Sequence, residues 1–327
     1  MQKSAIIFIC ALLNLCRTAS AQDHEEMFSP SDEFSQIYAS SVVLMDSDAL
    51  SFGVGNFDPE EILQPNNNNL NTDSIDLRNQ ISVFSIPYTI ELGSDLATYQ
   101  DYLQLQVAYI KQKGEVSLEE SLTPDLDKEE VFAINLSIAR QLYLDKNWSI
   151  TPTIAAYFLH YKNTHSYNSE LSQSLQEELD ALLFNQKKNA IIIEPGVEFA
   201  YLKDNDWGSW EFKSELHYMQ GRTTSRLADG EYGYPNGWRV INGFKLKNTF
   251  AQARLFANDF YLKANRIDIT GDTVTSLGTR HYYEVGFGIL WDLRNMTDLV
   301  ENVGIGININ HGSAVSGGSI VLYFNEW

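Results

Sequence analysis

The stretch that decides the fold is the last one, Leu299-Val-Glu-Asn-Val-Gly-Ile-Gly-Ile-Asn-Ile-Asn-His-Gly-Ser-Ala-Val-Ser-Gly-Gly-Ser-Ile-Val-Leu-Tyr-Phe-Asn-Glu-Trp327. From Val303 to Asn310, apolar residues alternate strictly with glycine or asparagine, which is the period of a β-strand with one apolar face. A glycine-rich connector at 312–318 precedes a second strand that runs to Trp327. An apolar strand at a sheet edge invites aggregation, and pairing the last strand with the first removes that edge. We therefore expect this hairpin to close a β-barrel.

Residues 1–21 have the features of an export signal. Lys3 provides a basic start, 5–15 form an apolar core, and Ala19-Ser20-Ala21 is a small-residue cleavage site. The apolar core is too short to span a bilayer as a helix. We predict a signal peptide at 1–21, an N-terminal segment at 22–49 that is first flexible and then a lead-in or lumen strand, and an outer-membrane β-barrel at 50–327.

Charge and cysteine content exclude several classes of function. The chain carries 43 Asp and Glu against 23 Lys and Arg, a net charge of −20. Binding of nucleic acid relies on basic residues that face phosphates, so we expect no nucleic-acid partner. Both cysteines, Cys10 and Cys16, lie in the predicted signal peptide. The rest of the chain therefore has no thiol for disulfides, catalysis or metal binding.

Twelve segments have strand-like patterns, and most are as long as the roughly 9–11 residues that cross a bilayer as a tilted strand. They are Leu50–Phe57, Gln80–Leu92, Tyr99–Lys111, Val131–Tyr143, Trp148–Tyr161, Asn189–Leu202, Trp207–Gln220, Trp238–Phe250, Arg254–Ile269, Arg280–Leu293, Val300–His311 and Ser319–Trp327.

The connectors between these segments alternate between long and short. Bacterial outer-membrane barrels have long outer loops, short periplasmic turns and an even number of strands. The alternation holds only if Ile37–Met45 is not a further membrane strand. We therefore predict Ile37–Met45 as an extended segment that leads into, or occupies, the lower end of the barrel.

The two faces of the segments differ in polarity. In 131–143, Phe132, Ile134 and Leu136 share one face, and Asn135 and Ser137 share the other. An apolar outward face, a polar inward face and aromatic residues near strand ends are typical of a transmembrane barrel. A soluble all-β protein has the same period, but the connectors and the signal favour the membrane. The predicted fold is an all-β, transmembrane antiparallel β-barrel of about twelve strands.

One segment has the period of a helix. Leu171, Leu175 and Leu179 recur at helical spacing between 169 and 184, beside several acidic residues. We predict a short amphipathic helix in the longest outer loop. Packing on the barrel mouth is favoured over binding of a partner, because such stripes usually face a core.

Two stretches carry a resemblance to a known family, Ser40-Ser-Val-Val-Leu-Met-Asp-Ser-Asp-Ala-Leu-Ser-Phe-Gly-Val54 and Ser82-Val-Phe-Ser-Ile-Pro-Tyr88. They resemble the solitary outer-membrane autotransporter-like β-barrel family of Gram-negative bacteria, and the layout is similar to the twelve-stranded autotransporter translocator domain. The resemblance implies a location in the bacterial outer membrane. Because only the short segment 22–49 precedes the first strand, it also implies a barrel without a secreted passenger.

The terminal strand departs from the usual insertion signal of such barrels. Aromatic or apolar residues are expected at the end and at alternate positions before it, but Asn325 interrupts this set. We expect Tyr323 and Trp327 to form the assembly signal. Which of the two alternating sets of side chains in the last strand faces lipid stays open. The expected partners are outer-membrane lipid and the outer-membrane assembly machinery, and the chain is expected to be a monomer.

Charged side chains on the inward faces are the candidate site residues. Charged linings set the selectivity of pores. We favour the alternative that acids and bases pair across the lumen, since both signs are present. The lumen candidates are Glu194, Glu198, Glu211, Lys213, Glu215, His217, Arg239, Lys245, Lys247, Lys263, Glu284 and Asp292.

A catalytic site is disfavoured. Glu215 and His217 share one face of a strand, but Ser214 faces the opposite side. A Gly-x-Ser-x-Gly elbow that would present a nucleophile is absent from the sequence. We expect no enzyme activity, no cofactor and no metal. The favoured function is a structural or translocator-like membrane module. The alternatives are a passive channel for small solutes and, less favoured, an outer-membrane hydrolase.

Overall fold

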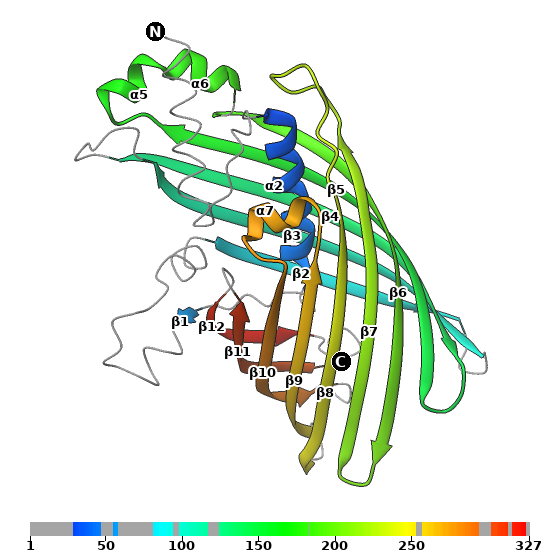
Figure 1. Cartoon of the computed structure of the whole chain (residues 1–327). Helices are drawn as coiled ribbons and strands as arrows, with labels where there is room; N and C mark the ends of the chain where they lie inside the picture. Colours follow the sequence, from blue (N-terminus) through cyan, green and yellow to red (C-terminus); the bar gives the residue numbers. More distant parts are fainter. Residues whose placement is uncertain are drawn as a thin grey trace.

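The fold is an antiparallel β-sheet that curls around a helix (Figure 1). The computed structural model describes residues 29–46, 55–57, 81–93, 98–116, 124–182, 184–252, 257–293, 302–312 and 316–324. The predicted signal peptide at 1–21 and Trp327 lie outside these residues. The strands are β1 (Gly55–Phe57), β2 (Ile81–Leu92), β3 (Tyr99–Val116), β4 (Asp125–Tyr143), β5 (Trp148–Ser166), β6 (Lys187–Asn205), β7 (Gly208–Thr223), β8 (Asn236–Gln252), β9 (Ala257–Ile269), β10 (His281–Asp292), β11 (Asn302–Gly312) and β12 (Gly317–Phe324).

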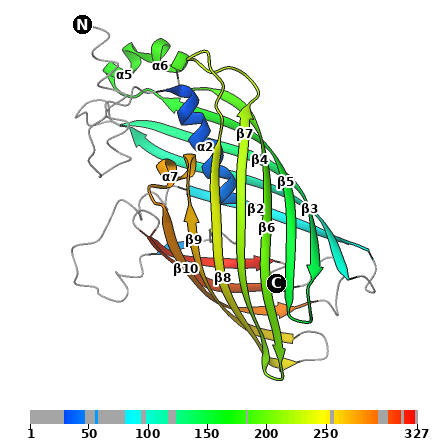
Figure 2. The ribbon, with the colours of Figure 1, turned by 45° about the vertical axis from the view of Figure 1, so that its right-hand side comes forward.

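The sheet order follows the chain except at its first strand. From β2 to β12 each strand pairs with its sequence neighbour, and β1 pairs with β12, with Gly55 opposite Ile320. The structure confirms the predicted all-β fold of twelve antiparallel strands, with the first strand paired to the last. In the described residues β1 and β2 are the two edges, so that this part of the sheet forms a curled half-barrel (Figures 1 and 2).

The two ends of the half-barrel differ, as the alternation of the connectors indicates. Tight turns join β4 to β5 and β6 to β7 at one end, here called the turn end. Longer connectors lie at the other, here called the loop end, and carry α5 (Glu170–Ser174), α6 (Gln176–Leu182) and α7 (Asp272–Leu277). The strands extend further toward the loop end than the sequence indicates, since β3 continues to Val116 and β4 begins at Asp125.

The amphipathic segment at 169–184 forms two short helices instead of one. Ser169 caps α5 through a capping box with Ser172, and the helix stops at Leu175, whose φ of −103° and ψ of 3° are not helical. Leu179 and Phe184 are buried together, with Leu171, Leu175 and Tyr167 packed against them. The leucine stripe therefore covers a small apolar cluster at the loop end.

The prediction that Ile37–Met45 is extended is wrong. Residues Pro30–Met45 form the helix α2, which starts at the loop end and runs along the concave face of the sheet (Figure 2). Ser29 accepts a hydrogen bond from the Asp32 N–H, and Pro30 occupies the first turn, where its missing N–H costs nothing. Twelve of its sixteen residues are buried. A helix that is covered on nearly all sides lacks the one-sided stripe that reveals a helix in sequence.

The outward face of the sheet is apolar, as predicted. Phe132, Ile134 and Leu136 are exposed, whereas Asn135 and Ser137 are buried on the concave side. The last strand, whose parity was left open, turns Ile320 and Leu322 outward and Val321 and Tyr323 inward. None of the helices in the described parts of the chain is both long and apolar enough to cross a membrane.

Candidate functional site

The candidate site is a charged cluster on the concave face, at the end of α2. Arg239 on β8 is 1% exposed, and its Nη2 atom lies 2.6 Å from Glu194 Oε1 on β6. The same nitrogen lies 2.9 Å from Oδ2 of Asp46, the residue that follows α2. One buried cation therefore joins the barrel wall to the end of the interior helix.

A histidine extends the cluster along β7. His217 Nδ1 lies 3.0 Å from Glu194 Oε1, and its Nε2 atom lies 3.2 Å from Glu215 Oε2. Lys213 Nζ in turn lies 2.8 Å from Glu215 Oε1. We call Asp46, Arg239, Glu194, His217, Glu215 and Lys213 the latch cluster. Its acidic and basic groups alternate, so that each buried charge has an opposite neighbour, which is the arrangement that burial of charge requires.

The side chains of this cluster that come from β6, β7 and β8 lie on the same face of the sheet, because every second residue of a strand points to the same side. Glu194 and Glu198 share one face of β6, and Lys213, Glu215 and His217 share one face of β7. His217 pairs in register with Arg239, and Gly196 faces His217 from β6. A Cβ atom at Gly196 would lie 2.5 Å from His217 Nδ1, so the imidazole occupies the space that glycine leaves.

The other end of α2 is held at the loop end. The Ser31 N–H donates to Asp229 Oδ2 at 2.9 Å, and Ser35 Oγ accepts from the Tyr234 N–H at 2.8 Å. Burial alone would raise the pKa of Asp229, but hydrogen bonds from the Glu231 and Ser31 N–H groups hold it below its usual range. Both Asp229 and Tyr234 belong to the β7–β8 connector, which therefore anchors the start of the helix.

Apolar and polar contacts hold α2 between these two anchors. The rings of Phe34 and Tyr161 meet edge to face at 5.2 Å between centroids, and Tyr38, Val42 and Val43 are fully buried. Gln106 Nε2 on β3 donates to the Met45 carbonyl at 3.0 Å. The helix is thus packed against the wall along its whole length.

The remaining predicted lumen charges lie apart from the latch cluster. Lys263 Nζ is 2.8 Å from Glu284 Oε1, and Lys247 Nζ is 3.1 Å from Asp259 Oδ2. Thr151 Oγ1 donates to Glu198 at 3.4 Å. Glu211 pairs in register with Lys245, and both are half-buried, as is Asp292 near the turn end. The structure therefore brings together five of the twelve predicted residues in the latch cluster, namely Glu194, Lys213, Glu215, His217 and Arg239, and it groups others into separate pairs.

The residues considered for hydrolysis are not assembled around His217. Both ring nitrogens of His217 contact carboxylates. The Ser214 hydroxyl instead donates to Asn242 Oδ1 at 2.8 Å. The parts of the chain that the structure describes contain no group of three His, Cys, Asp or Glu side chains placed to hold a metal ion.

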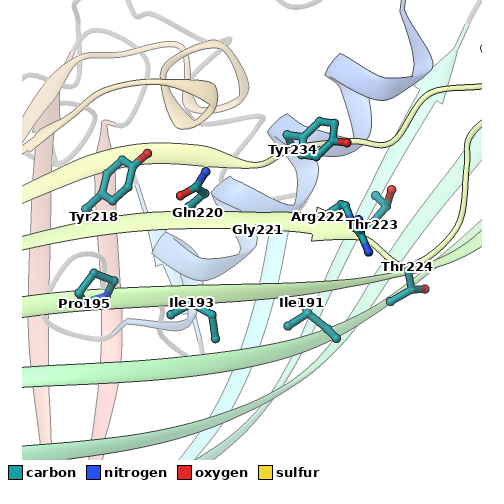
Figure 3. Close-up of a pocket in the computed structure, with 10 residues that line it drawn as sticks. All are labelled: Ile191, Ile193, Pro195, Tyr218, Gln220, Gly221, Arg222, Thr223, Thr224 and Tyr234. Atoms are coloured by element: carbon teal, nitrogen blue, oxygen red, sulfur yellow. The ribbon is translucent and has the colours of Figure 1, made fainter.

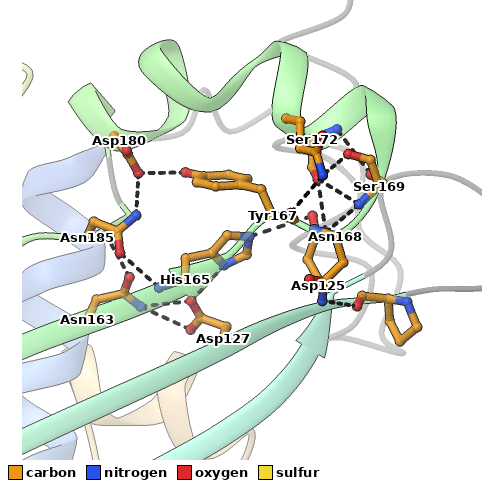
Figure 4. A network of polar contacts seen from close by, with 12 residues as sticks. Asp125, Asp127, Asn163, His165, Tyr167, Asn168, Ser169, Ser172, Asp180 and Asn185 are labelled. Carbon is orange, nitrogen blue, oxygen red and sulfur yellow. Dashed lines mark hydrogen bonds and ion pairs between the residues drawn. The ribbon is translucent and has the colours of Figure 1, made fainter.

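A second polar cluster lies at the loop end (Figure 4). His165 Nδ1 is 2.9 Å from Asp127 Oδ1, and Phe184 stacks on the imidazole at 3.8 Å between ring centroids. Asp125 Oδ1 accepts from the Asn168 and Ser169 N–H groups and from Ser172 Oγ. The Ser172 hydroxyl takes part in the capping box of α5. Its side chain is fully buried, so a substrate could not reach it.

A tyrosine closes the outer side of this second cluster. Tyr167 OH donates to Asp180 Oδ1 at 2.7 Å, and burial together with this hydrogen bond raises the pKa of Tyr167 well above its usual range. Asn185 Nδ2 reaches the same carboxylate oxygen at 2.6 Å. These bonds join β4, β5 and the helices between β5 and β6, and we call Asp125, Asp127, His165, Tyr167 and Asp180 the loop cluster.

Tyr323, one half of the predicted assembly signal, faces the interior. Its hydroxyl donates to Asn308 Oδ1 at 2.9 Å, and its ring meets Tyr261 edge to face at 5.0 Å. Glycines on the inner face of β10 and β11 leave room for these rings, since a Cβ at Gly288 would lie 2.8 Å from Tyr261 Cε1.

Sequence reasoning missed Asp46 and the helix that carries it. Asp46 stood out only as a break in an apolar run. A usable signal was present at the start of the helix, where Ser29, Pro30, Asp32 and Glu33 form the pattern of an N-cap, a first-turn proline and first-turn acids.

The fold and its occupied concave face define a barrel of the outer-membrane type. The family model of the solitary outer membrane autotransporter beta-barrel domain matches residues 35–326, and the chain belongs to this family. Membership confirms the predicted family and implies a location in the outer membrane. The match begins inside α2, so it includes most of the interior helix as well as the strands.

Solved structures with a similar fold include two autotransporter domains. The transport unit of the autotransporter AIDA-I from Escherichia coli is 12% identical, with a TM-score of 0.47 over 89% of this chain and 96% of that chain. The beta domain of the Bordetella autotransporter Brka is 10% identical, with a TM-score of 0.45 over 75% and 88%. LpxR from Salmonella typhimurium is 8% identical, with a TM-score of 0.42 over 82% and 96%. A search of curated proteins gave no match.

Proposed function

We propose that the chain is a translocator-like module of the outer membrane whose interior is held closed by α2. The supporting observation is Arg239, which is buried and contacts both the wall, through Glu194, and the end of the helix, through Asp46. We also propose that residues 1–21 direct export to this membrane and are then removed, because they have the three parts of a signal peptide.

The strength of the attachment favours a closed module over a passive channel. Leaving Arg239 without a partner, or Glu194 without a cation, would bury an unpaired charge, which is strongly unfavourable. The opposite end of the helix is tied to the β7–β8 connector through Ser31 and Ser35. Release of α2 therefore requires the loss of contacts at both ends and along its apolar middle.

The test is the conductance of purified protein in planar lipid bilayers. We expect the intact chain to give little steady current. A variant in which residues 29–45 are replaced by a Gly-Ser linker of equal length should give large, steady currents. Folding of both proteins is checked by heat-modifiable migration in gels.

A matched control replaces the loop-end helices, residues 170–182, with the same kind of linker. These helices pack on their own apolar cluster, so the control should remain closed. Large steady currents from the intact chain would instead support the passive solute channel. Low current from the folded variant without α2 would overturn the proposal.

A further inference from the structure

A groove lies on the outward face of the barrel, across β6 and β7 near the loop end (Figure 3). Its volume is about 650 Å3. Ile191, Ile193 and Pro195 form one side, and Tyr218 and Tyr234 form the other, as Figure 3 shows. Ile191 and Ile193 are 51% and 42% exposed, so the groove presents apolar surface to whatever surrounds the barrel.

The groove follows an interruption in the sheet. The pairing of β6 with β7 is continuous up to Ile193 opposite Gln220 and resumes at Gly196 opposite His217. Pro195 lies in the gap and has no N–H to give to a neighbouring strand. The ring of Tyr218 packs at a tilt against Trp238 of β8, with 4.6 Å between ring centroids, which fixes the position of Tyr218 on the far side of the groove.

The loop end of the groove is basic, although the chain as a whole has a net charge of −20. Arg222 is exposed and pairs in register with Ile191. The guanidinium carbons of Arg222 and Arg226 lie 4.9 Å and 5.6 Å from the centroid of the Tyr232 ring.

Of the two acidic residues of the same connector, Glu231 is exposed and Asp229 is directed away from the groove. Asp229 turns its carboxylate to Ser29 and Ser31 of α2, on the concave side. On the outward face of β6 the order from the loop end is Lys187, Asn189, Ile191, Ile193 and Pro195, with the cation first and the apolar residues after it. On β7 the corresponding order is Arg222, Gln220 and Tyr218.

We propose that this groove binds a membrane lipid with a phosphate-bearing head group, and this inference goes beyond the proposed function. One acyl chain lies along Ile191, Ile193 and Pro195, where its burial is favourable. The phosphate lies at Arg222 and Arg226, because the planar guanidinium donates paired hydrogen bonds to phosphate oxygens. The order of charged and apolar residues along the groove matches the order of head group and chain in such a lipid.

Trp238 provides a reporter, since its ring is exposed and lies against Tyr218, which lines the groove. Full-length protein is placed in nanodiscs of phosphatidylcholine that contain phosphatidic acid with brominated acyl chains. Bromine quenches tryptophan fluorescence on contact, and Trp238→Phe identifies the share of the signal that comes from this site. We expect brominated phosphatidic acid to quench Trp238 more strongly than brominated phosphatidylcholine does.

The double variant Arg222→Gln/Arg226→Gln should weaken this preference at least about fivefold, since one basic residue at a membrane surface contributes about that factor. Arg140→Gln is the matched control, because Arg140 also lies over a tyrosine ring, 4.5 Å from the Tyr99 centroid, but far from the groove. The control should keep the full preference. Heat-modifiable migration shows that each variant is folded.

Inorganic phosphate distinguishes a lipid site from a simple anion site. Millimolar phosphate should leave the quenching unchanged, because the acyl chain supplies part of the binding. The proposal is overturned by equal quenching from the two brominated lipids, by an unchanged preference in the double variant, or by displacement with inorganic phosphate.

Discussion

The latch cluster and the loop cluster both place a basic side chain between two carboxylates, but they connect different parts of the barrel. Arg239 joins Glu194 of the wall to Asp46 at the end of α2. His165 lies 2.9 Å from Asp127 and 3.7 Å from Asp125, and both of these belong to the adjacent strand β4. The same chemistry therefore holds an interior helix in one place and fastens a connector to its own strands in the other.

The second difference is in how each carboxylate is satisfied. Asp125 accepts three hydrogen bonds from the residues that start α5, and Asp127 accepts two from Asn163 Nδ2. One oxygen of each buried carboxylate, Glu194 Oε2 and Asp125 Oδ2, has no hydrogen-bond partner among the described residues. The other oxygen of Glu194, however, contacts the basic side chains of Arg239 and His217. The latch cluster consequently depends on its basic side chains more than the loop cluster does.

Removing the latch cation should have the largest effect. Arg239→Met leaves Glu194 and Asp46 without their shared cation, and loss of one partner from a buried ion pair costs about 3–5 kcal/mol. We expect the free energy of unfolding in detergent micelles to fall by that amount, and the conductance in planar bilayers to rise. Arg266→Met is the control, because Arg266 pairs with Asp268 at the surface, where a bridge contributes about 0–1 kcal/mol. An equal loss in the free energy of unfolding of the two variants would contradict a special role for the buried ion pair of Arg239.

Removing the imidazole of His165 from the loop cluster should have an intermediate effect. His165→Leu retains much of the apolar contact with Phe184, and both aspartates keep their other donors. We expect a loss of about 1–3 kcal/mol in the free energy of unfolding, the cost of leaving a buried polar group without one partner. Conductance should stay at the level of the intact chain. An increase in conductance would show that the loop cluster also holds the helix.

Acid should loosen the start of α2 by a smaller amount. Asp229 has a lowered pKa in the folded chain, so its stabilising contribution is present above its ordinary value of 3.8 and is lost as the pH falls through the lower folded value. We expect hydrogen exchange of the amides at 30–35, corrected for the intrinsic effect of pH, to accelerate in that range. The variant Asp229→Asn should show no such acceleration at acid pH. Its free energy of unfolding should be lower by about 0.3–1 kcal/mol, the contribution expected of a charge at a helix N-terminus. Asp32→Asn is a control that should keep the acceleration.

The outward face could be predicted from the sequence because lipid-facing strands have a simple period. Phe132 and Ile134 alternate with buried Ala133 and Asn135 as expected. The hydrophobic pattern of α2 could not reveal its helix, since Ser41, Val42 and Val43 are consecutive and all buried. A continuous apolar run does not distinguish a buried strand from a buried helix.

The candidate site was predictable only in part, for a related reason. The two-residue period places Glu215 and His217 on one face, but it does not say which residues of other elements they meet. The partner Asp46 follows a helix that enters from the loop end, about 190 residues before Arg239 in the chain. Such a contact depends on the path of α2, which the pattern of the strands does not determine.

The most direct test of the interior position of α2 is an engineered disulfide between Ser35→Cys and Gly233→Cys. A Cβ atom at Gly233 would lie 3.1 Å from Ser35 Oγ, and in a disulfide each Cβ lies about 3 Å from the opposite sulfur atom. Outside residues 1–21 the chain has no other cysteine. We predict that the pair in folded protein from outer membranes oxidises nearly completely, with no free thiol and with the low conductance of the intact chain. Two free thiols in folded, oxidised protein would contradict the placement of α2 inside the barrel.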